Sequence, residues 1–233
     1  MIEFQNVSKR FGTVQALDHI DLTIDEGKIV GLFGPNGAGK STMMKIMAGV
    51  NRADTGTVSI GGQTPRQAKE FVSYLPEIDH FYPWWTLKEA ADFLRAFYGD
   101  WDQEKYGHLL EFLKLQEDMK LGKISKGQRA KCKILLAVSR NAHYLLMDEP
   151  FSGIDILTRE EIARTLIQDF ADHQQTMIIS THEIGEIEAM VDQVIFLDQG
   201  QICLEGEAEE LRNEWGLSMV GIMKEVFRHA NSR

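Results

Sequence analysis

The chain has 233 residues, of which 43% are hydrophobic and 26% charged, and its 35 Asp and Glu outnumber 25 Lys and Arg to give a net charge of −10. That composition is typical of a globular protein with a substantial core, and the acidic balance argues against non-specific binding of nucleic acid. The longest unbroken apolar run, Ile134–Val138, is far shorter than a membrane span of ~20 residues. The N-terminal residues do not resemble a secretory signal, and two cysteines without metal-ligand spacing indicate a reducing cytosol.

The first sixty residues follow strand patterns. Ile20, Leu22 and Ile24 alternate with polar residues and predict a half-buried strand. The apolar run 29–33 predicts a buried strand, which is followed by a helix over 41–48 and a strand over 58–60. Together these elements indicate an N-terminal region rich in strands and turns.

The pattern becomes helical from about residue 80. Thr86 and Glu89 have the spacing of a capping box, which predicts a helix running to Phe97. Further helices are predicted over 104–113 and 126–139. Because this block has few strand signals, we interpret it as a helical insertion into an α/β core.

Two apolar runs follow the insertion, over 144–147 and 177–179. Between them, Thr158 and Glu161 form a second apparent capping box, which predicts a helix to residue 170. Strand, helix and strand at this spacing predict a parallel sheet with right-handed crossovers. Residues 194–204 predict a hairpin around Asp198-Gln199-Gly200.

A phosphate-binding loop lies between the predicted strand 29–33 and the helix after it. Gly34-Pro35-Asn36-Gly37-Ala38-Gly39-Lys40-Ser41 fits the pattern G-x-x-x-x-G-K-[ST]. Glycines let the backbone approach phosphates, and successive amides at a helix N-terminus attract them. Lys40 is therefore expected to reach the β- and γ-phosphates of a nucleotide, and the Ser41 hydroxyl to bind Mg²⁺.

Two acids, Asp148 and Glu149, end the predicted buried strand 144–147. Such a pair is commonly a solvated turn, but parallel strands end where ligands bind, and a phosphate loop needs an acid to hold its metal. Adjacent residues on an extended chain point in opposite directions. Asp148 is therefore predicted to hold Mg²⁺ through water, and Glu149 to orient the attacking water.

A third capping box opens the predicted helix at 126. Ser125 and Gln128 have the required spacing, and this pair alone is typical of an ordinary helix start. Four cations, however, lie in the first turns of this helix, where they oppose its dipole at ~0.3–1 kcal/mol each. They are Lys126, Arg129, Lys131 and Lys133. Their concentration in an acidic chain predicts an anion opposite them.

In combination, these motifs resemble the nucleotide-binding subunit of an ABC (ATP-binding cassette) transporter over residues 2 to about 212. The resemblance implies a P-loop NTPase core with a mixed, mainly parallel sheet, an N-terminal antiparallel β subdomain and an inserted helical subdomain. It implies ATP and Mg²⁺ as ligands. The Walker A loop is Gly34, Pro35, Asn36, Gly37, Ala38, Gly39, Lys40, Ser41 and Thr42, and Leu145–Glu149 is Walker B with its catalytic glutamate.

The remaining site residues are implied by the resemblance alone. Ile124–Gln128 lies where the family has LSGGQ, so that Ser125, Gly127 and Gln128 would bind a nucleotide. Asp155 falls in the D-loop, His182 at the switch histidine, and Phe11 where an aromatic ring stacks on adenine. Lys126 replaces the usual Gly. Glu77 replaces the usual lid Gln, and since an ionised Glu only accepts hydrogen bonds, it would face Mg²⁺ or the attacking water.

The resemblance also implies a mechanism and partners. Two copies pair head to tail, each ATP lies between the Walker A loop of one and the Ser125 helix of the other, and the cycle moves membrane permease subunits. A homodimer with two working sites, peripheral on the cytoplasmic face of the membrane, is expected, with a heterodimer as the alternative. The short chain, Glu77 and Lys126 are similar to bacterial exporter cassettes. The expected division is 1–77 with 144–212 as the ATP-binding core, 78–143 as the helical subdomain, and 213–233 as a helical tail.

Two other functions fit parts of the sequence. One is a soluble ABC ATPase that acts on nucleic acid or ribosomes, although such relatives usually carry long coiled-coil insertions or tandem cassettes. The other is a regulatory ATP-binding module without turnover, which the presence of Lys40, Asp148, Glu149 and His182 argues against. No nucleic acid partner is expected.

An aromatic segment, His80–Trp85, precedes the Thr86 capping box. Pro83 predicts a loop there rather than a continuous helix. Clustered aromatic rings in a surface loop often mark a partner site, although some of them commonly pack into the core. At least one ring among Phe81, Tyr82, Trp84 and Trp85 is therefore predicted to be exposed and to contact the permease.

Overall fold

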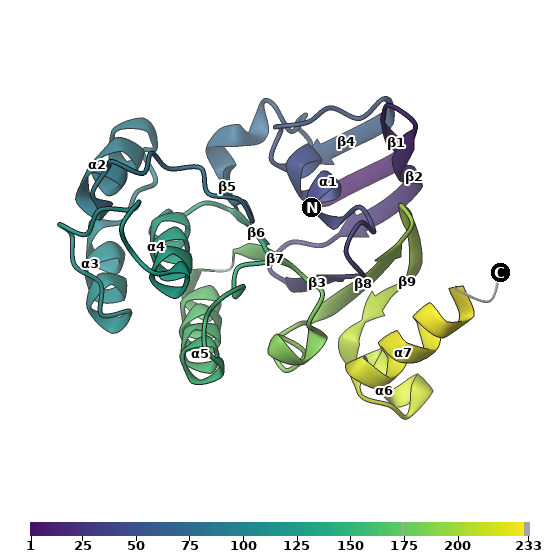
Figure 1. The fold of residues 1–233 in the computed structure, drawn as a ribbon. Helices are drawn as coiled ribbons and strands as arrows, with labels where there is room; N and C mark the ends of the chain where they lie inside the picture. The colour runs from purple at the N-terminus through teal and green to yellow at the C-terminus, as the bar shows by residue number, and fades with distance from the viewer. Residues whose placement is uncertain (174, 231–233) are drawn as a thin grey trace.

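A computed structural model of the protein describes residues 1–173 and 175–230. It contains an antiparallel sheet, a larger mainly parallel sheet and helices that pack around them (Figure 1). The small sheet has the order β2-β1-β4 and consists of β1 (Ile2–Phe11), β2 (Val14–Ile24) and β4 (Thr55–Ile60). The large sheet has the order β5-β6-β7-β3-β8-β9 and consists of β3 (Ile29–Phe33), β5 (Val72–Leu75), β6 (Tyr144–Asp148), β7 (Thr176–Thr181), β8 (Gln193–Asp198) and β9 (Gln201–Glu207).

The small sheet confirms the predicted strands at the N-terminus. Ile20, Leu22 and Ile24 are at most 4% exposed and point into the core, as their alternation predicts. Strand β1 pairs with both neighbours in antiparallel register, with Ile2 opposite Ile24 on one side and Ile60 on the other. The sheet therefore closes over one side of the molecule as the expected antiparallel β layer.

The large sheet is buried on both faces, which explains its continuous apolar strands. In β6, for example, Leu145 and Met147 pack into one hydrophobic cluster, while Tyr144 and Leu146 pack into another. Strands β5, β6, β7, β3 and β8 run parallel, and β9 pairs antiparallel with β8 through the predicted hairpin. The carboxyl ends of β3, β6 and β7 consequently meet at one edge of the sheet.

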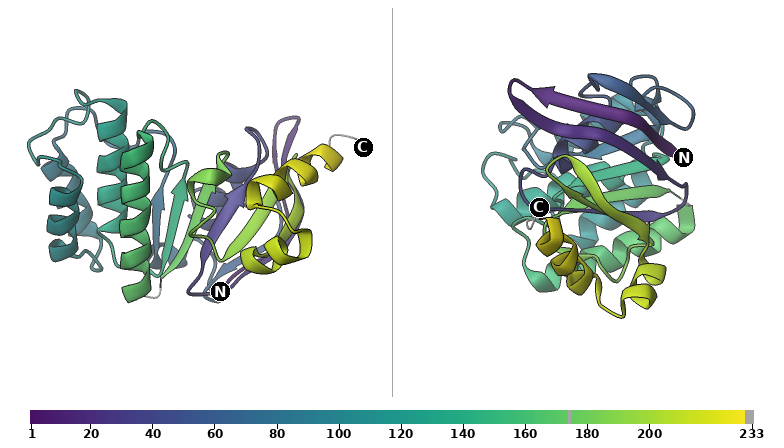
Figure 2. Two further views of the ribbon diagram at one scale, coloured as in Figure 1. Left: turned by 90° about the horizontal axis from the view of Figure 1, so that it is seen from below. Right: turned by 90° about the vertical axis from the view of Figure 1, so that its right-hand side faces the viewer.

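The helices are found close to their predicted positions. They are α1 (Lys40–Met47), α2 (Leu87–Phe97), α3 (Gln103–Phe112), α4 (Lys126–Val138), α5 (Ile156–His173), α6 (Ala208–Trp215) and α7 (Met219–Ala230), with 3₁₀ turns at Ala68–Phe71 and Ile184–Glu186. Helices α2, α3 and α4 form an arm at one end of the molecule, and α6 and α7 lie at the other end (Figures 1 and 2). Reciprocal capping boxes begin α2 at Thr86 and α4 at Ser125, as predicted.

The predicted start of α5 is wrong. The helix begins at Ile156, and Thr158 lies inside it rather than capping it. The side chain of Asp155 accepts a hydrogen bond from the Thr158 amide at 3.0 Å, which is the geometry of an N-cap residue. Asp155 thus caps the helix in place of the predicted Thr158–Glu161 pair. The helix ends at His173, three residues beyond the predicted end at residue 170.

The division of the chain into three parts stays a prediction. The arm of α2, α3 and α4 lies within the 78–143 segment expected to be helical. Helix α6 runs across the expected boundary between residues 212 and 213, and Met219 and Ile222 of α7 are fully buried in the larger hydrophobic cluster. The end of the chain therefore packs onto the core.

Candidate functional site

The loop between β3 and α1 is held tightly at two glycines. A Cβ at Gly34 would lie 2.2 Å from the Leu197 carbonyl oxygen, and one at Gly39 would lie 2.4 Å from the Ala16 carbonyl oxygen. Gly39 also has φ 113°, a backbone conformation that L side chains rarely adopt. Because neither position has room for a side chain, the loop packs closely against the main chain of the neighbouring strands β2 and β8. Helix α1 begins at the next residue, Lys40.

Lys40, the first residue of α1, is 6% exposed. Its Nζ donates to the carbonyl oxygens of Gly34 at 2.7 Å and Pro35 at 3.2 Å, and lies 3.7 Å from Oε1 of Glu149. Burial lowers the pKa of Lys40, and the charges of Glu149, Asp148 and Glu77 oppose that shift. The phosphate loop thus holds a buried ammonium facing carboxylates.

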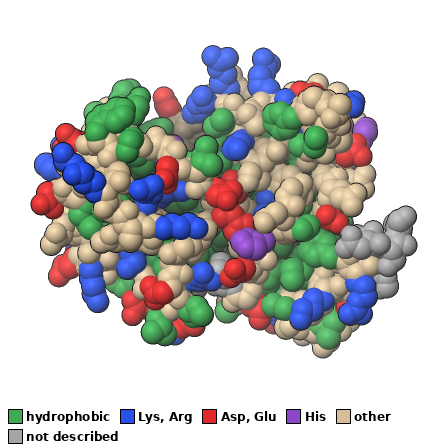
Figure 3. Space-filling model, viewed as in Figure 1, with side chains coloured by type: hydrophobic (Ala, Val, Ile, Leu, Met, Phe, Trp, Pro, Cys, Tyr) green, Lys and Arg blue, Asp and Glu red, His purple; other side chains and the backbone are tan. Residues whose placement is uncertain are grey.

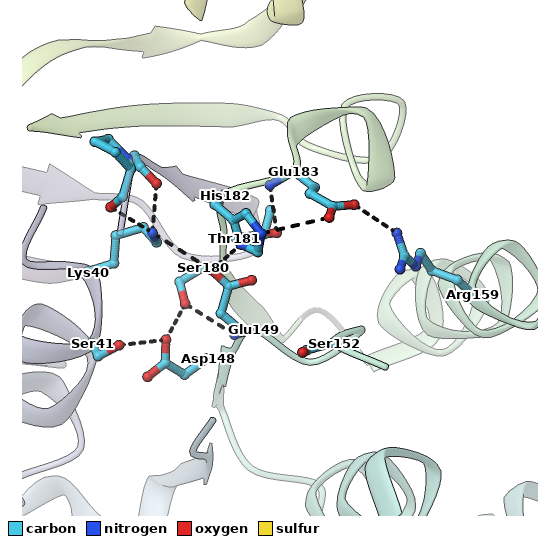
Figure 4. Close-up of polar contacts among 12 residues, drawn as sticks. Lys40, Ser41, Asp148, Glu149, Ser152, Arg159, Ser180, Thr181, His182 and Glu183 are labelled. Atoms are coloured by element: carbon cyan, nitrogen blue, oxygen red, sulfur yellow. Dashed lines mark hydrogen bonds and ion pairs between the residues drawn. The ribbon is translucent and has the colours of Figure 1, made fainter. Parts of the chain in front are cut away.

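Asp148 lies at the end of β6 and is 1% exposed. Its Oδ1 accepts hydrogen bonds from the hydroxyls of Ser41 at 3.2 Å and Ser180 at 2.5 Å (Figure 4). Ser180 was not among the predicted site residues, and the parallel register of β6 and β7 places it directly beside Asp148. The register of β3 and β7 also places Thr181 beside Phe33, the last residue before the phosphate loop. The ends of β3, β6 and β7 therefore lie next to one another, with the phosphate loop, Asp148 and Ser180 at the same edge of the sheet.

Glu149 follows with φ 48°, because β6 ends at Asp148 and the chain turns. The expected reason for the separate directions of the two acids, a strand extended through both, is therefore wrong. The left-handed turn at Glu149 gives each acid its own partners. The Glu149 amide donates to the Ser180 carbonyl at 3.0 Å, and its carboxylate accepts from His182.

His182 extends this site toward the surface. Its Nδ1 lies 3.0 Å from Oε1 of Glu149, and its side chain is 46% exposed. The neighbouring Glu183 pairs with Arg159 of α5 at 3.2 Å and lies 3.7 Å from Nε2 of His182 (Figure 4). The predicted catalytic trio of Lys40, Glu149 and His182 is thus brought together, with Glu183 and Arg159 as neighbours that sequence reasoning missed.

Comparison with known proteins decides the family. The family model for ABC transporters matches residues 17–152, which is more than half of the chain. The Nod factor export ATP-binding protein I of Burkholderia lata is 31% identical over 231 residues, covering 95% of this chain and 76% of that one. This chain belongs to the ABC transporter family. It is an ATP-binding and ATP-hydrolysing subunit that powers transport through membrane permease subunits.

Other ABC proteins agree with this assignment. The petrobactin import ATP-binding protein YclP of Bacillus subtilis is 30% identical, covering 91% of this chain and 88% of that one. A solved ATP-binding subunit of an ABC transporter superposes with a TM-score of 0.87 at 25% identity, covering 97% of this chain and 99% of that one. Within residues 1–173 and 175–230, no helix has both the length and the apolar character needed to span a bilayer.

The ABC signature segment lies at the N-terminus of α4. Ser125 Oγ accepts a hydrogen bond from the main-chain N–H of Gln128 at 3.1 Å, and the side-chain Oε1 of Gln128 accepts one from the main-chain N–H of Ser125 at 3.0 Å. Gln128 therefore uses its carbonyl oxygen for capping and retains its NH₂ group as a donor. A Cβ at Gly127 would lie 3.1 Å from the Gly153 carbonyl oxygen, which shows that the signature segment approaches the D-loop within its own chain.

Two of the four basic residues in the first turns of α4 contact the lid loop, which consists of residues 77–79. Arg129 pairs with Asp79 at 2.5 Å, and Lys133 Nζ donates to the Glu77 carbonyl oxygen at 2.6 Å. Burial lowers the pKa of Lys133, and Asp79, Glu77 and Asp148 act in the opposite direction. The predicted anion opposite the cations therefore includes a carboxylate of the same chain.

Glu77 and Glu149 line the same cavity. Its volume is about 400 Å³, and Lys126 and Ser152 also border it. Phe11 lies apart from these residues at the end of β1. Its ring is 49% exposed, with Lys9 Nζ 5.2 Å from its centroid, and thus has a surface free for stacking.

The aromatic segment of the ABC subunit is a loop, as predicted, and its rings divide into two kinds. Tyr82 and Trp84 are 53% and 65% exposed, whereas Phe81 and Trp85 are partly buried against the core. The prediction that at least one ring is exposed is confirmed, and the alternative that some rings pack inward also holds. A continuous aromatic ladder extends the segment onto α2, consisting of Trp84, Tyr82, Trp85, Phe93 and Phe97.

The ladder is a surface feature. Neighbouring ring centroids in it are 4.7 to 5.1 Å apart, and Phe93 and Phe97 are 45% and 70% exposed. Hydrophobic side chains gather over α2 in the space-filling view (Figure 3). Only the loop part of this surface was predicted from sequence; Phe93 and Phe97, four residues apart on one face of α2, extend it in the structure.

Proposed function

We propose that the edge of the large sheet is the ATP-hydrolysis site and that Glu149 orients the attacking water. The observation that carries this proposal is the position of the Glu149 carboxylate, 3.0 Å from His182 and 3.7 Å from the Lys40 ammonium. Lys40 and the loop amides would bind the β- and γ-phosphates, and His182 would contact the γ-phosphate. Phe11 would stack on adenine.

The oxygen ligands at the start of α1 and the end of β6 fit Mg²⁺. A serine hydroxyl and a carboxylate are hard oxygen ligands, and Ser41 Oγ and Asp148 Oδ1 already lie 3.2 Å apart. We propose that Ser41 binds the ion directly and that Asp148 holds it through water, with Ser180 fixing the orientation of the carboxylate. Glu77 would face the same region. The ion, when bound, neutralises charge on the phosphates.

We further propose that two copies of this chain pair head to tail. Ser125, Gly127 and Asp155 would then complete the ATP site of the partner. Ser125 and Lys126 are exposed at the start of α4, where a helix N-terminus favours phosphate. A solved bacterial ABC transporter cassette described as dimeric is 25% identical with a TM-score of 0.80, which supports the proposal.

The aromatic ladder is the proposed contact with the permease. A groove of about 280 Å³ lies beside it, and its lining includes Phe81, Leu94 and Tyr98. Large rings suit such an interface because they bury area at little cost in rotamer entropy. This contact would hold the subunit on the cytoplasmic face of the membrane. The direction of transport stays a prediction of export, since the relatives include both import and export proteins.

Replacing Glu149 with Gln tests the hydrolysis site. The amide keeps the size of the side chain but removes its ability to accept a proton, so hydrolysis should slow by about 10²–10⁴-fold while ATP binding persists. A dimer trapped with ATP should appear by size-exclusion chromatography. Glu161→Gln, an equal change on the exposed surface of α5, is the matched control. Hydrolysis by Glu149→Gln at the control rate would remove Glu149 from the proposed role.

A further inference from the structure

The lid loop 77–79 is bordered by cavities. The 400 Å³ cavity next to Glu149 includes Glu77 and Asp79 in its lining, and two more of about 280 Å³ each lie around His80 and Phe81. Residues 77–80 are all exposed. Close packing therefore contributes little to the position of this loop, and its polar contacts have a correspondingly large part in fixing it.

Those contacts come from one face of α4. Arg129 and Lys133 are four residues apart, so their side chains lie one above the other on the helix. Arg129 pairs with the Asp79 carboxylate at 2.5 Å, and Lys133 Nζ donates to the Glu77 main-chain oxygen at 2.6 Å. The lid loop is thus attached to the helix at two points.

Lys133 is the better fixed of the two. Lys133 as a whole residue is 9% exposed, whereas the side chains of Arg129 and Asp79 are 35% and 49% exposed. A lysine that is nearly buried needs compensating hydrogen bonds, because leaving an ammonium without them in an apolar setting is costly. The bond to the Glu77 carbonyl supplies one, and Lys133 borders all three cavities, where water can reach its other donors.

The N-terminal end of α4 has a second proposed role, which is to contact the nucleotide bound by the partner. Ser125 caps it, and Lys133 lies eight residues further on, a rise of about 12 Å along the helix. Cys132 and residues 134–138 are buried in the larger hydrophobic cluster, so α4 is packed against the core from Cys132 onward, and Ser125 and Lys133 belong to the same unbroken helix. A single helix therefore joins the proposed contact with the partner's ATP to the lid loop of its own site.

We propose that Lys133 is a positioning residue, which holds the Glu77 carboxylate in the ATP site and makes its position follow that of α4. This inference rests on the proposed role of Glu77. The bond is made to the main chain of residue 77, so it fixes where the side chain starts without occupying the carboxylate. When α4 moves on engaging a partner's nucleotide, Lys133 carries Glu77 with it.

The first test replaces Lys133 with Met, which keeps the length of the side chain and removes its donors. We expect kcat for ATP to fall about tenfold and KM to change less than about threefold, because phosphate binding by Lys40 and the loop is retained. Lys133→Arg, which restores a donor, should recover most of the loss. Lys123→Met, an exposed lysine of the same arm, is the matched control.

A double-mutant cycle separates positioning from mere stability. In a Glu77→Ala background there is no carboxylate to position, so adding Lys133→Met should lower kcat less than about twofold further. If Lys133→Met does not fold, Lys133→Gln, a shorter polar side chain that removes the ammonium, replaces it in the same cycle with the same expected pattern.

Two results would overturn the inference. One is an equal loss of kcat in both backgrounds, which would show that Lys133 acts independently of Glu77. The other is a Glu77→Ala or Lys133→Met chain with the kcat of the unaltered protein. Neither result touches the proposed function, which fails instead if the unaltered chain does not hydrolyse ATP or if Glu149→Gln hydrolyses it normally.

Discussion

The edge of the large sheet and the helical arm are built in contrasting ways. At the sheet edge, Lys40 and Asp148 are 6% and 1% exposed, and their polar atoms are paired within the chain. On the arm, Ser125 and Lys126 are exposed, as are two rings of the aromatic segment. The sheet register fixes the first region before any partner binds. The second has surfaces that a partner would complete.

The contrast is consistent with the proposal that one chain carries both halves of a site that it does not complete alone. Chemistry that must be accurate, such as orienting water next to a phosphate, benefits from groups held by buried contacts. Surfaces that must engage and release a second molecule have to remain accessible. Under the proposed function, the exposed signature segment and aromatic ladder would be the moving parts of the subunit, and the buried site would be its fixed part.

The largest expected effect comes from disturbing the fixed part at Gly39. Gly39→Ala places a methyl group 2.4 Å from the Ala16 carbonyl oxygen at φ 113°, so the loop must shift. We expect loss of ATP binding, measured with a fluorescent ATP analogue, and a drop in unfolding free energy of several kcal/mol, about 3 or more. Gly12→Ala is the control.

Gly12 also has a positive φ, of 57°, but a Cβ there would have nothing within 4 Å. Gly12→Ala therefore only places a non-glycine residue in a left-handed backbone conformation, which should lower the unfolding free energy by about 1–2 kcal/mol. Urea unfolding measures both variants. Equal destabilisation by the two substitutions would mean that the tight packing of the phosphate loop contributes nothing, and the contrast between the two regions would be broken at that point.

A smaller effect on stability is expected from the rings of the arm. Changing both Tyr82 and Trp84 to Ser should lower unfolding free energy by no more than about 1 kcal/mol, because both are exposed. Trp85→Ala should cost about 3 kcal/mol, since this ring packs against the core. Thermal melting of the purified chains distinguishes the two.

The same Tyr82 and Trp84 variant should lose co-purification with the permease from native membranes. If its melting temperature falls as far as that of Trp85→Ala, the exposed rings are part of the folded core and the docking proposal is wrong. If stability and co-purification are both retained, the permease binds elsewhere.

Much of this organisation could be predicted from sequence because it follows local patterns. The phosphate loop, the apolar strands and the capping boxes at Thr86 and Ser125 each depend on residues close together in the chain. The start of α5 was mistaken because Thr158 and Glu161 have capping-box spacing, and only the folded backbone shows that Asp155, three residues earlier, accepts the hydrogen bond.

What could not be predicted depends on contacts between distant segments. Ser180 has no motif of its own and meets Asp148 only through the register of two parallel strands. The pair of Arg129 and Asp79 joins residues fifty positions apart. The turn at Glu149 departs from the strand that precedes it. Local periodicity carries no information on any of these features.

The central claim is that the fixed and moving regions of two chains combine into one ATP site, and mixed dimers test it directly. Lys40→Ala damages the fixed half and Ser125→Arg the moving half, so each variant alone should be inactive. In a mixed dimer, one site carries both changes and the other carries neither. Equal mixing should therefore restore about a quarter of the unaltered ATPase activity if the sites act independently. Mixed dimers shown to form but without any recovered activity would contradict the claim.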